Sequence, residues 1–141
     1  MRLSKRGEYG LRALQYLAVH YGEGPVRNKD LARRNNIPPR FLEQIMLLLK
    51  YGRIVHSHRG PQGGYYLARP PQQINLAEVV RLLDGPLAPI SCVSETAYEP
   101  CGCPDVEACG LRRVMKEVRD AVAGIMESTT LADLVAGQTP S

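Results

Sequence analysis

A glycine-rich turn between two short strand-like segments constrains the fold of this chain more than any other feature of its sequence. Residues 54–57 and 65–68 each have the pattern of a β-strand. The seven residues between them include three glycines and a proline, which allow the backbone to reverse direction sharply. The sequence therefore predicts a β-hairpin over about residues 54–68.

Two short helices are expected immediately before this hairpin. The first runs from about Asn28, as its N-cap, to residue 34, and the second opens with Pro39 and continues to about Tyr51. The connection between them is tight, because Pro38 holds the residue before it out of the helical region. Two short helices joined in this way and followed by a hairpin make a winged helix-turn-helix.

The segments on either side of this unit complete the predicted organisation. Apolar residues at helical spacing indicate a helix over residues 4–21, and Asn75 with Glu78 forms a capping pair for a helix that ends near Asp84. The fold class is therefore mainly α with a small β-hairpin (α+β). We expect a winged helix-turn-helix domain over 1–84, a cysteine-bearing loop over 85–110, and a long dimerisation helix with a short C-terminal helix over 111–141.

The long helix, from Leu111 to about Glu127, has an apolar face that one small domain is not expected to cover. Pairing with a second copy would cover it, and two-fold dimers are the commonest assembly. The alternative is that this helix packs back on its own domain. Thr130 is expected to cap the last short helix. The predicted apolar stripe consists of Leu111, Val114, Val118, Ala121 and Ile125, widened by Met115, Val122 and Met126.

Charge is distributed unevenly along the chain. Residues 1–70 carry 13 Lys and Arg against 4 Asp and Glu, whereas residues 71–141 carry 5 against 10. A basic first half predicts a polyanionic partner, double-stranded DNA, for that half alone. The longest apolar run has five residues, at 45–49, and a membrane span needs about 20. With no secretory signal at residues 1–6 either, we expect a cytoplasmic protein without a membrane partner.

Side chains at the start of the second short helix are expected to read base edges in the major groove. Arginine suits guanine, glutamine suits adenine, and a glutamate either accepts from cytosine or stays solvated. Phe41 either contacts a thymine methyl group or packs inside the domain. Arg59 in the hairpin turn suits a narrow minor groove. The predicted DNA-binding residues are Lys5, Asn28, Arg40, Phe41, Glu43, Gln44, Arg59, Gly60 and Gly63.

All four cysteines fall within 18 residues of the predicted loop, at Cys92, Cys101, Cys103 and Cys109. Structural disulfides are disfavoured in a cytoplasmic protein, so the group indicates metal binding or redox sensing. The spacing C-x8-C-x-C-x5-C lacks the C-x2-C knuckles usual in zinc ribbons. An iron–sulfur cluster tolerates such spacing and is the favoured interpretation, with a zinc site and a thiol switch as the alternatives.

Four segments closely resemble the IscR/NsrR-type winged-helix regulators of the Rrf2 superfamily. They are residues 1–9, 37–44, 59–65 and 130–134, which appear in the same order over nearly the whole chain. The resemblance implies a homodimer crossed by the long helix, which binds a palindromic operator and holds its ligand in the loop before that helix. Members respond to iron–sulfur status, nitric oxide, iron or cysteine supply. Arg59 and residues 40–44 match the DNA-contacting positions of the family.

The chain departs from this family at the cysteines. The family commonly has three, the last two often separated by five residues as Cys103 and Cys109 are, which makes Cys101 an extra thiol. Arg112 stands where the IscR branch has a histidine, and an arginine does not ligate iron. A four-iron cluster or an all-cysteine site is therefore favoured over a two-iron cluster with a histidine ligand, and the choice between [4Fe–4S] and [2Fe–2S] stays open.

The expected function is that of a dimeric, sequence-specific transcription regulator, with repression as the expected mode. It would sense iron–sulfur, iron, redox or nitric oxide status through a cysteine-ligated cluster. A cluster-free repressor of cysteine metabolism and a thiol redox switch are the alternatives, and a small iron–sulfur electron carrier is the alternative of another class. We expect no enzyme, because the sequence has no Ser-His-Asp order, phosphate loop or paired-carboxylate pocket.

Overall fold

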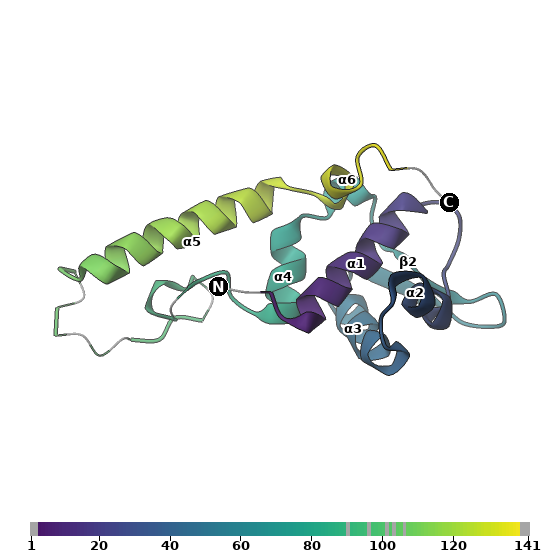
Figure 1. The fold of residues 1–141 in the computed structure, drawn as a ribbon, viewed down its shortest axis with the longest axis horizontal. Coiled ribbons are helices and arrows are strands. Elements are labelled where there is room, and N and C mark those ends of the chain that lie inside the picture. The colour runs from purple at the N-terminus through teal and green to yellow at the C-terminus, as the bar shows by residue number, and fades with distance from the viewer. Residues whose placement is uncertain are drawn as a thin grey trace.

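A computed structural model describes residues 3–89, 91–95, 97–100, 102, 104–105 and 107–138, leaving aside the side chain of Ser91 (Figure 1). Within these residues the chain forms α-helices, short 3₁₀ helices and a two-stranded sheet. They are α1 (Lys5–Val19), α2 (Asn28–Asn35), α3 (Pro39–Tyr51), β1 (Val55–His58), β2 (Gly64–Leu67), η1 (Pro71–Gln73), α4 (Leu76–Asp84), η2 (Ser91–Val93), α5 (Gly110–Ser128) and α6 (Leu131–Leu134).

The ends of the helices follow local capping chemistry. Proline at the first position and Gly52 after the last give α3 the predicted bounds, Pro39–Tyr51. Asn75 and Glu78 exchange hydrogen bonds between side chain and backbone, so the predicted capping pair of α4 is confirmed. The expectation that Asn28 caps α2 is wrong, because Arg27 occupies the N-cap position and Asn28 is the first helical residue.

The helix-turn-helix consists of α2 and α3, which pack against each other and against α1. Asn36 turns the chain between them in the left-handed region, with φ of 54°. The side chains that α2 and α3 bury here are mostly leucine, isoleucine and methionine, which drive the packing through loss of apolar surface to water. They include Leu31, Leu42, Ile45, Met46 and Leu49, all within one cluster.

The hairpin is antiparallel, with Val55 opposite Leu67 and His58 opposite Gly64. The first strand begins one residue later than predicted, since the amide of Ile54 donates to the carbonyl of Leu49 at the end of α3 (2.9 Å). With this hairpin and the helices before it, the predicted mainly α, winged-helix fold is confirmed.

A third segment joins the hairpin from the connection between α1 and α2. Val26 and Tyr65 exchange two backbone hydrogen bonds of 2.8 Å. Gly64 makes this approach possible, because its φ is +151° and a Cβ there would lie 2.3 Å from the carbonyl oxygen of Val26. The hairpin is therefore attached to the helical core along β2.

The helix α5 extends away from the other helices, as Figure 1 shows, and carries two parallel stripes of side chains. One stripe is half-buried against α4 and η2, and Ala123 beside it is buried. The other stripe is exposed, with Leu111 at 61% and Ile125 at 66% of full exposure. The half-buried stripe comprises Arg112, Met115, Arg119, Val122 and Met126, and the exposed stripe comprises Leu111, Val114, Val118, Ala121 and Ile125.

After α5 the chain returns to the core of the first helices. Asn75 and Thr130 form an antiparallel bridge, and the amide of Leu131 donates to the carbonyl of Ile74 (2.9 Å). Thr130 caps α6 as predicted, and Leu131 is fully buried in the same cluster as Leu14 of α1. The predicted division at residues 84 and 110 stays a prediction, but α6 packs with the winged helix.

Candidate DNA-binding surface and cysteine loop

The first turns of α3 present polar side chains to solvent. Arg40, Glu43 and Gln44 are all exposed, while Leu42 between them is buried. Because these three positions share one face of the helix, a groove that admits α3 would meet them together. The structure thus brings these three predicted residues onto one surface.

Two of the other predicted DNA-binding residues lie beside that surface. Phe41 is half-buried, with its ring edge-to-face on Tyr9 at a centroid distance of 5.6 Å. Lys5 is exposed at the start of α1, where its ammonium lies 3.6 Å from a carboxylate oxygen of Glu8 and 5.7 Å from the centroid of the Tyr9 ring. Phe41 therefore packs within the domain, and a role in DNA contact stays a prediction for both residues.

Asn28 joins the two helices of the helix-turn-helix. Its side-chain nitrogen donates to the backbone carbonyl of Pro39 (3.1 Å), so the start of α2 is held against the start of α3. Its side-chain oxygen is buried and has no hydrogen-bond partner among the described residues. A phosphate contact for Asn28 stays a prediction, and the structure gives this side chain a positioning contact.

The turn of the hairpin exposes Arg59 and is shaped by its glycines. Gly60 has φ of +111°, and the amide of Gly63 donates to the Gly60 carbonyl (2.9 Å). A Cβ on Gly63 would lie 2.1 Å from the carbonyl oxygen of His58, so this position requires glycine. The guanidinium of Arg27 donates to the carbonyl of Pro61, a contact that sequence reasoning missed because it joins residues 34 apart.

The second strand of the hairpin is coupled electrostatically to α3. Burial raises the pKa of the Tyr65 phenol, and the negative charge of Glu43 raises it further. The charge of Glu43 on α3 therefore acts on β2, and α3 also packs against β1.

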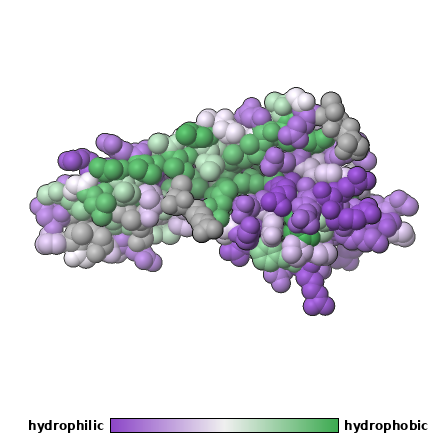
Figure 2. Space-filling model, viewed as in Figure 1, coloured by the Kyte–Doolittle hydropathy of each residue, from purple (hydrophilic) through white to green (hydrophobic). Residues whose placement is uncertain are grey.

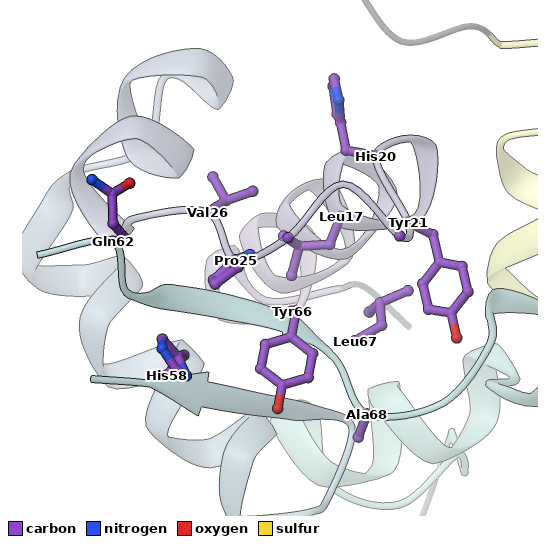
Figure 3. A pocket seen from close by; sticks show the side chains of 12 residues that line it. Leu17, His20, Tyr21, Pro25, Val26, His58, Gln62, Tyr66, Leu67 and Ala68 are labelled. Carbon is purple, nitrogen blue, oxygen red and sulfur yellow. The ribbon is translucent and has the colours of Figure 1, made fainter. Parts of the chain in front are cut away.

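A cavity of about 690 Å³ lies behind the hairpin, between its strands and the end of α1 (Figure 3). Tyr66 and His58 line it from the strands, and Leu17 and Tyr21 line it from the end of α1 and the turn after it. The hairpin is thus attached to the core through Val26, and an open cavity lies between β2 and the end of α1.

Two of the four cysteines lie among the described residues, and Cys101 and Cys103 lie outside them. Cys92 is in the 3₁₀ turn η2 and is 3% exposed. Cys109 is the N-cap of α5, and its sulfur accepts a hydrogen bond from the backbone amide of Arg112 (3.4 Å). Within the residues that the structure describes, no three His, Cys, Asp or Glu side chains come together in a group that could hold a metal ion.

The donor set nevertheless fits an iron–sulfur cluster in its chemistry. Thiolates are the usual ligands of such clusters, and hydrogen bonds to their sulfurs tune them. The amide of Arg112 makes such a bond to Cys109. The Nε atom of Arg112 is itself buried, without a hydrogen-bond partner among the described residues. The thiols of Cys92 and Cys109 are of the right chemical type for a cluster, and ligation by the four cysteines stays a prediction.

No helix in the described part of the chain is long and apolar enough to cross a membrane.

Comparison with known proteins settles the family. The Rrf2 family profile, described as iron-dependent transcriptional regulator, matches residues 3–137. The chain belongs to the Rrf2 family. The HTH-type transcriptional regulator CymR of Bacillus subtilis is 36% identical, over 95% of this chain and 89% of its own length.

Two solved structures of this family superpose well on the chain. The structure of CymR, named as the global cysteine regulator of B. subtilis, has a TM-score of 0.80 and 34% identity, with 95% of each chain covered. The structure of T. potens IscR has a TM-score of 0.77 and 31% identity, covering 100% of this chain and 93% of that one. This Rrf2 protein is therefore a winged-helix transcriptional regulator of the helix-turn-helix type.

Proposed function

We propose that this Rrf2 protein is a homodimeric repressor that binds a palindromic operator in the cytoplasm, with no catalytic step. Its affinity for the operator changes with the state of the cysteine loop, which senses iron–sulfur, iron, redox or nitric oxide status. One observation carries the DNA-binding part of the proposal. The exposed, polar start of α3 and the exposed Arg59 both belong to the half of the chain that carries 13 Lys and Arg against 4 Asp and Glu.

These side chains suit a DNA duplex in their chemistry. The major groove admits one helix, so α3 can present Arg40, Glu43 and Gln44 to base edges. The hairpin beside it then lies over the flanking backbone or minor groove, where negative potential attracts Arg59. Lys5, which is exposed at the start of α1, would contact phosphate and so fix the register without reading sequence.

The proposed dimer follows from the exposed stripe of α5. Leu111, Val114, Val118 and Ile125 all face solvent in a single chain, and Figure 2 shows hydrophobic residues gathered along this helix. A stripe of this length on a monomer would leave a large apolar surface in water, whereas a second copy would bury it. The half-buried stripe beside it keeps each α5 attached to its own winged helix.

The sensing part rests on the cysteines. Cys92 and Cys109 would hold an iron–sulfur cluster with Cys101 and Cys103, and the cluster would supply a redox- and nitric oxide-reactive centre. Arg112 cannot replace the histidine ligand of IscR, so we propose thiolate ligation in this chain. Four thiolates can hold either a [4Fe–4S] or a [2Fe–2S] cluster, so the iron and sulfide content per chain, and not the number of cysteines, decides the nuclearity.

A cluster-free repressor of cysteine metabolism is the second candidate. Two observations favour it: the similarity to CymR, whose structure is named as that of a cysteine regulator, and Arg112 at the histidine position. In that case the cysteines would act as thiol switches or have no regulatory role. Nothing in the structure favours an electron carrier, which has no use for a winged helix.

Anaerobic purification separates these candidates. The visible absorption spectrum, together with iron, zinc and acid-labile sulfide content, distinguishes a cluster from zinc and from free thiols. An operator selected from random duplexes then gives affinities for the protein as purified and after removal of iron with a chelator. We expect iron and sulfide in the protein and at least a fivefold change in affinity. A colourless, iron-free protein that binds its operator tightly would support the CymR-like alternative instead.

A further inference from the structure

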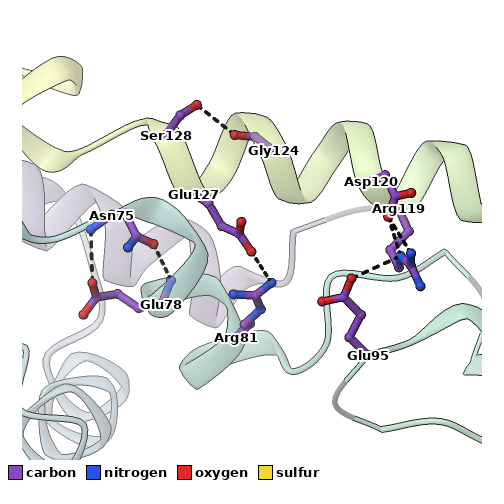
Figure 4. Close-up of polar contacts among 9 residues, drawn as sticks. All are labelled: Asn75, Glu78, Arg81, Glu95, Arg119, Asp120, Gly124, Glu127 and Ser128. Atoms are coloured by element: carbon purple, nitrogen blue, oxygen red, sulfur yellow. Dashed lines mark hydrogen bonds and ion pairs between the residues drawn. The ribbon is translucent and has the colours of Figure 1, made fainter.

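Among the described residues, Arg119 is the one charged side chain of α5 that forms a half-buried hydrogen bond between this helix and the cysteine loop. Only 13% of its side chain is exposed. One guanidinium nitrogen donates to the backbone carbonyl of Val93 at 2.7 Å. The other nitrogens face the carboxylates of Asp120 at 2.5 Å and Glu95 at 3.7 Å (Figure 4).

Val93, whose carbonyl accepts the hydrogen bond from Arg119, directly follows Cys92 in the chain. Cys92, Val93 and Ser94 are all buried, so this turn packs as a unit rather than lying on the surface. A charge-assisted hydrogen bond to a buried carbonyl is stronger than a neutral one, and a carbonyl that loses its donor without gaining water loses that stabilisation. The position of the turn around Cys92 is therefore linked to the position of Arg119 on α5.

Arg119 lies on α5 between the proposed dimer surface and the contact of α5 with the winged helix. On one side of α5, Val118 belongs to the exposed stripe proposed to face a second copy. Two turns further along, Glu127 pairs with Arg81 of α4 at 2.9 Å, and α4 packs on α1 and α3 of the winged helix. A shift of the turn that holds Cys92 would thus reach α5, and α5 contacts the helix bundle that carries the reading face.

We propose that Arg119 is the positioning residue that transmits the state of Cys92 to α5. This inference rests on the proposed function, since it concerns how the cysteine loop and the operator are coupled. Arg119 itself touches neither a ligand of the loop nor DNA; it holds the turn of Cys92 in a fixed position on the helix. Without its guanidinium, Cys92 changes state as before, but α5 no longer responds.

The experiment measures operator affinity in two states of the cysteine loop. The operator selected above is titrated by fluorescence anisotropy with dimeric protein purified without oxygen, and again after removal of iron with a chelator. The ratio of the two dissociation constants is the coupling. Four proteins are compared: the unmodified chain, Arg119→Gln, Arg119→Lys, and Arg113→Gln as a matched control on an exposed arginine of the same helix.

We expect the unmodified chain to show a ratio of at least fivefold, and Arg119→Gln to bring the ratio to within twofold of one. Arg113→Gln should keep the original ratio, and Arg119→Lys should restore part of it, because an ammonium can still donate to the Val93 carbonyl. Thermal unfolding confirms that each variant is folded. Hydrogen exchange should be faster at residues 91–95 in Arg119→Gln and unchanged in Arg113→Gln.

The outcomes separate the inference from the proposal beneath it. If Arg119→Gln is folded and keeps the ratio of the unmodified chain, Arg119 does not transmit the state of Cys92 and the inference is overturned. If the unmodified chain already shows a ratio of one, the state of the cysteine loop does not control the operator, and the sensing part of the proposed function fails rather than the role of Arg119.

Discussion

The winged helix and the long helix α5 are built on opposite principles. In the winged helix, α1 and α4 begin with side-chain caps, and the apolar faces of α1 to α4 converge on one closed core that also includes Leu131. In α5, half of the apolar surface is open, and Ala123 is its only buried residue among those described. Figure 2 shows the same contrast, with hydrophilic residues over the end that holds α2 and hydrophobic residues along α5.

This difference separates two kinds of stability. The winged helix buries its apolar side chains within one chain, so its stability depends on packing inside that chain. The exposed stripe of α5 gains from burial only when another surface covers it. Changes in the core should therefore act on unfolding, whereas changes in the stripe should act on assembly.

Removing a core side chain should have the largest effect. Leu131→Ala deletes most of a fully buried side chain that joins α6 to α1 and η1, so we expect unfolding to become easier by about 3 kcal/mol. Urea denaturation measures this. The control is Leu47→Ala on α3, which shortens a leucine that is 55% exposed. It should lower the free energy of unfolding by well under half as much. Equal losses would mean that α6 is not part of the core.

A charge in the exposed stripe of α5 should break assembly without unfolding the chain. Val118→Glu places a carboxylate where a second copy is proposed to pack, and we expect the dimer to dissociate at micromolar concentration. Sedimentation velocity measures the mass. Lys116→Glu introduces a carboxylate on an exposed position outside the stripe and should leave the dimer intact. A Val118→Glu dimer of undiminished affinity would place the interface elsewhere.

At the hairpin, a change should affect binding alone. Arg59→Ala removes an exposed cation and should weaken operator binding about tenfold, with less preference for flanks that have a narrow minor groove. Anisotropy titration with two flanking sequences measures both effects. Gln62→Ala, in the same exposed turn but uncharged, should change affinity by less than twofold. If Arg59→Ala left the operator affinity unchanged for both flanking sequences, the hairpin would not be a DNA-binding element.

Loss of a single cap should have the smallest effect. Asn75→Ala removes the acceptor for the Glu78 amide and should lower the free energy of unfolding by about 1 kcal/mol. Asn75→Asp keeps an acceptor oxygen and should retain most of that stability. Urea denaturation compares the two, and an alanine variant as stable as the aspartate variant would show that the capping bond contributes nothing.

Local chemistry was enough to predict most of the helices and the hairpin. Proline and glycine mark the ends of α3, and the Asn75–Glu78 pair marks the start of α4, because these signals act over a few residues. The same reasoning failed at Asn28, whose side chain bonds to Pro39 across the turn instead of capping its own helix. A side chain that could cap its own helix does not do so when it hydrogen-bonds to a residue that is distant in sequence.

The candidate site was predictable in part for the same reason. Arg40, Glu43 and Gln44 fall on the exposed face of α3 because helical spacing alone fixes a face. The contacts of Arg119 with Val93 and of Arg27 with Pro61 join residues 26 and 34 apart, and no periodicity in the sequence reports them. The only sequence signal for these two contacts is the position of each arginine within or beside a pattern of apolar residues.

The bridge between Asn75 and Thr130 has a consequence for how such chains diversify. Since the amide of Leu76 donates to the carbonyl of Thr129 (2.9 Å), the start of α4 is joined to the end of α5, and the segment between these two helices lies inside a closed loop of chain. The entropy of closing a loop grows only slowly with its length. Insertions, deletions and new thiol spacings between α4 and α5 can therefore accumulate while the groove-reading half keeps its shape.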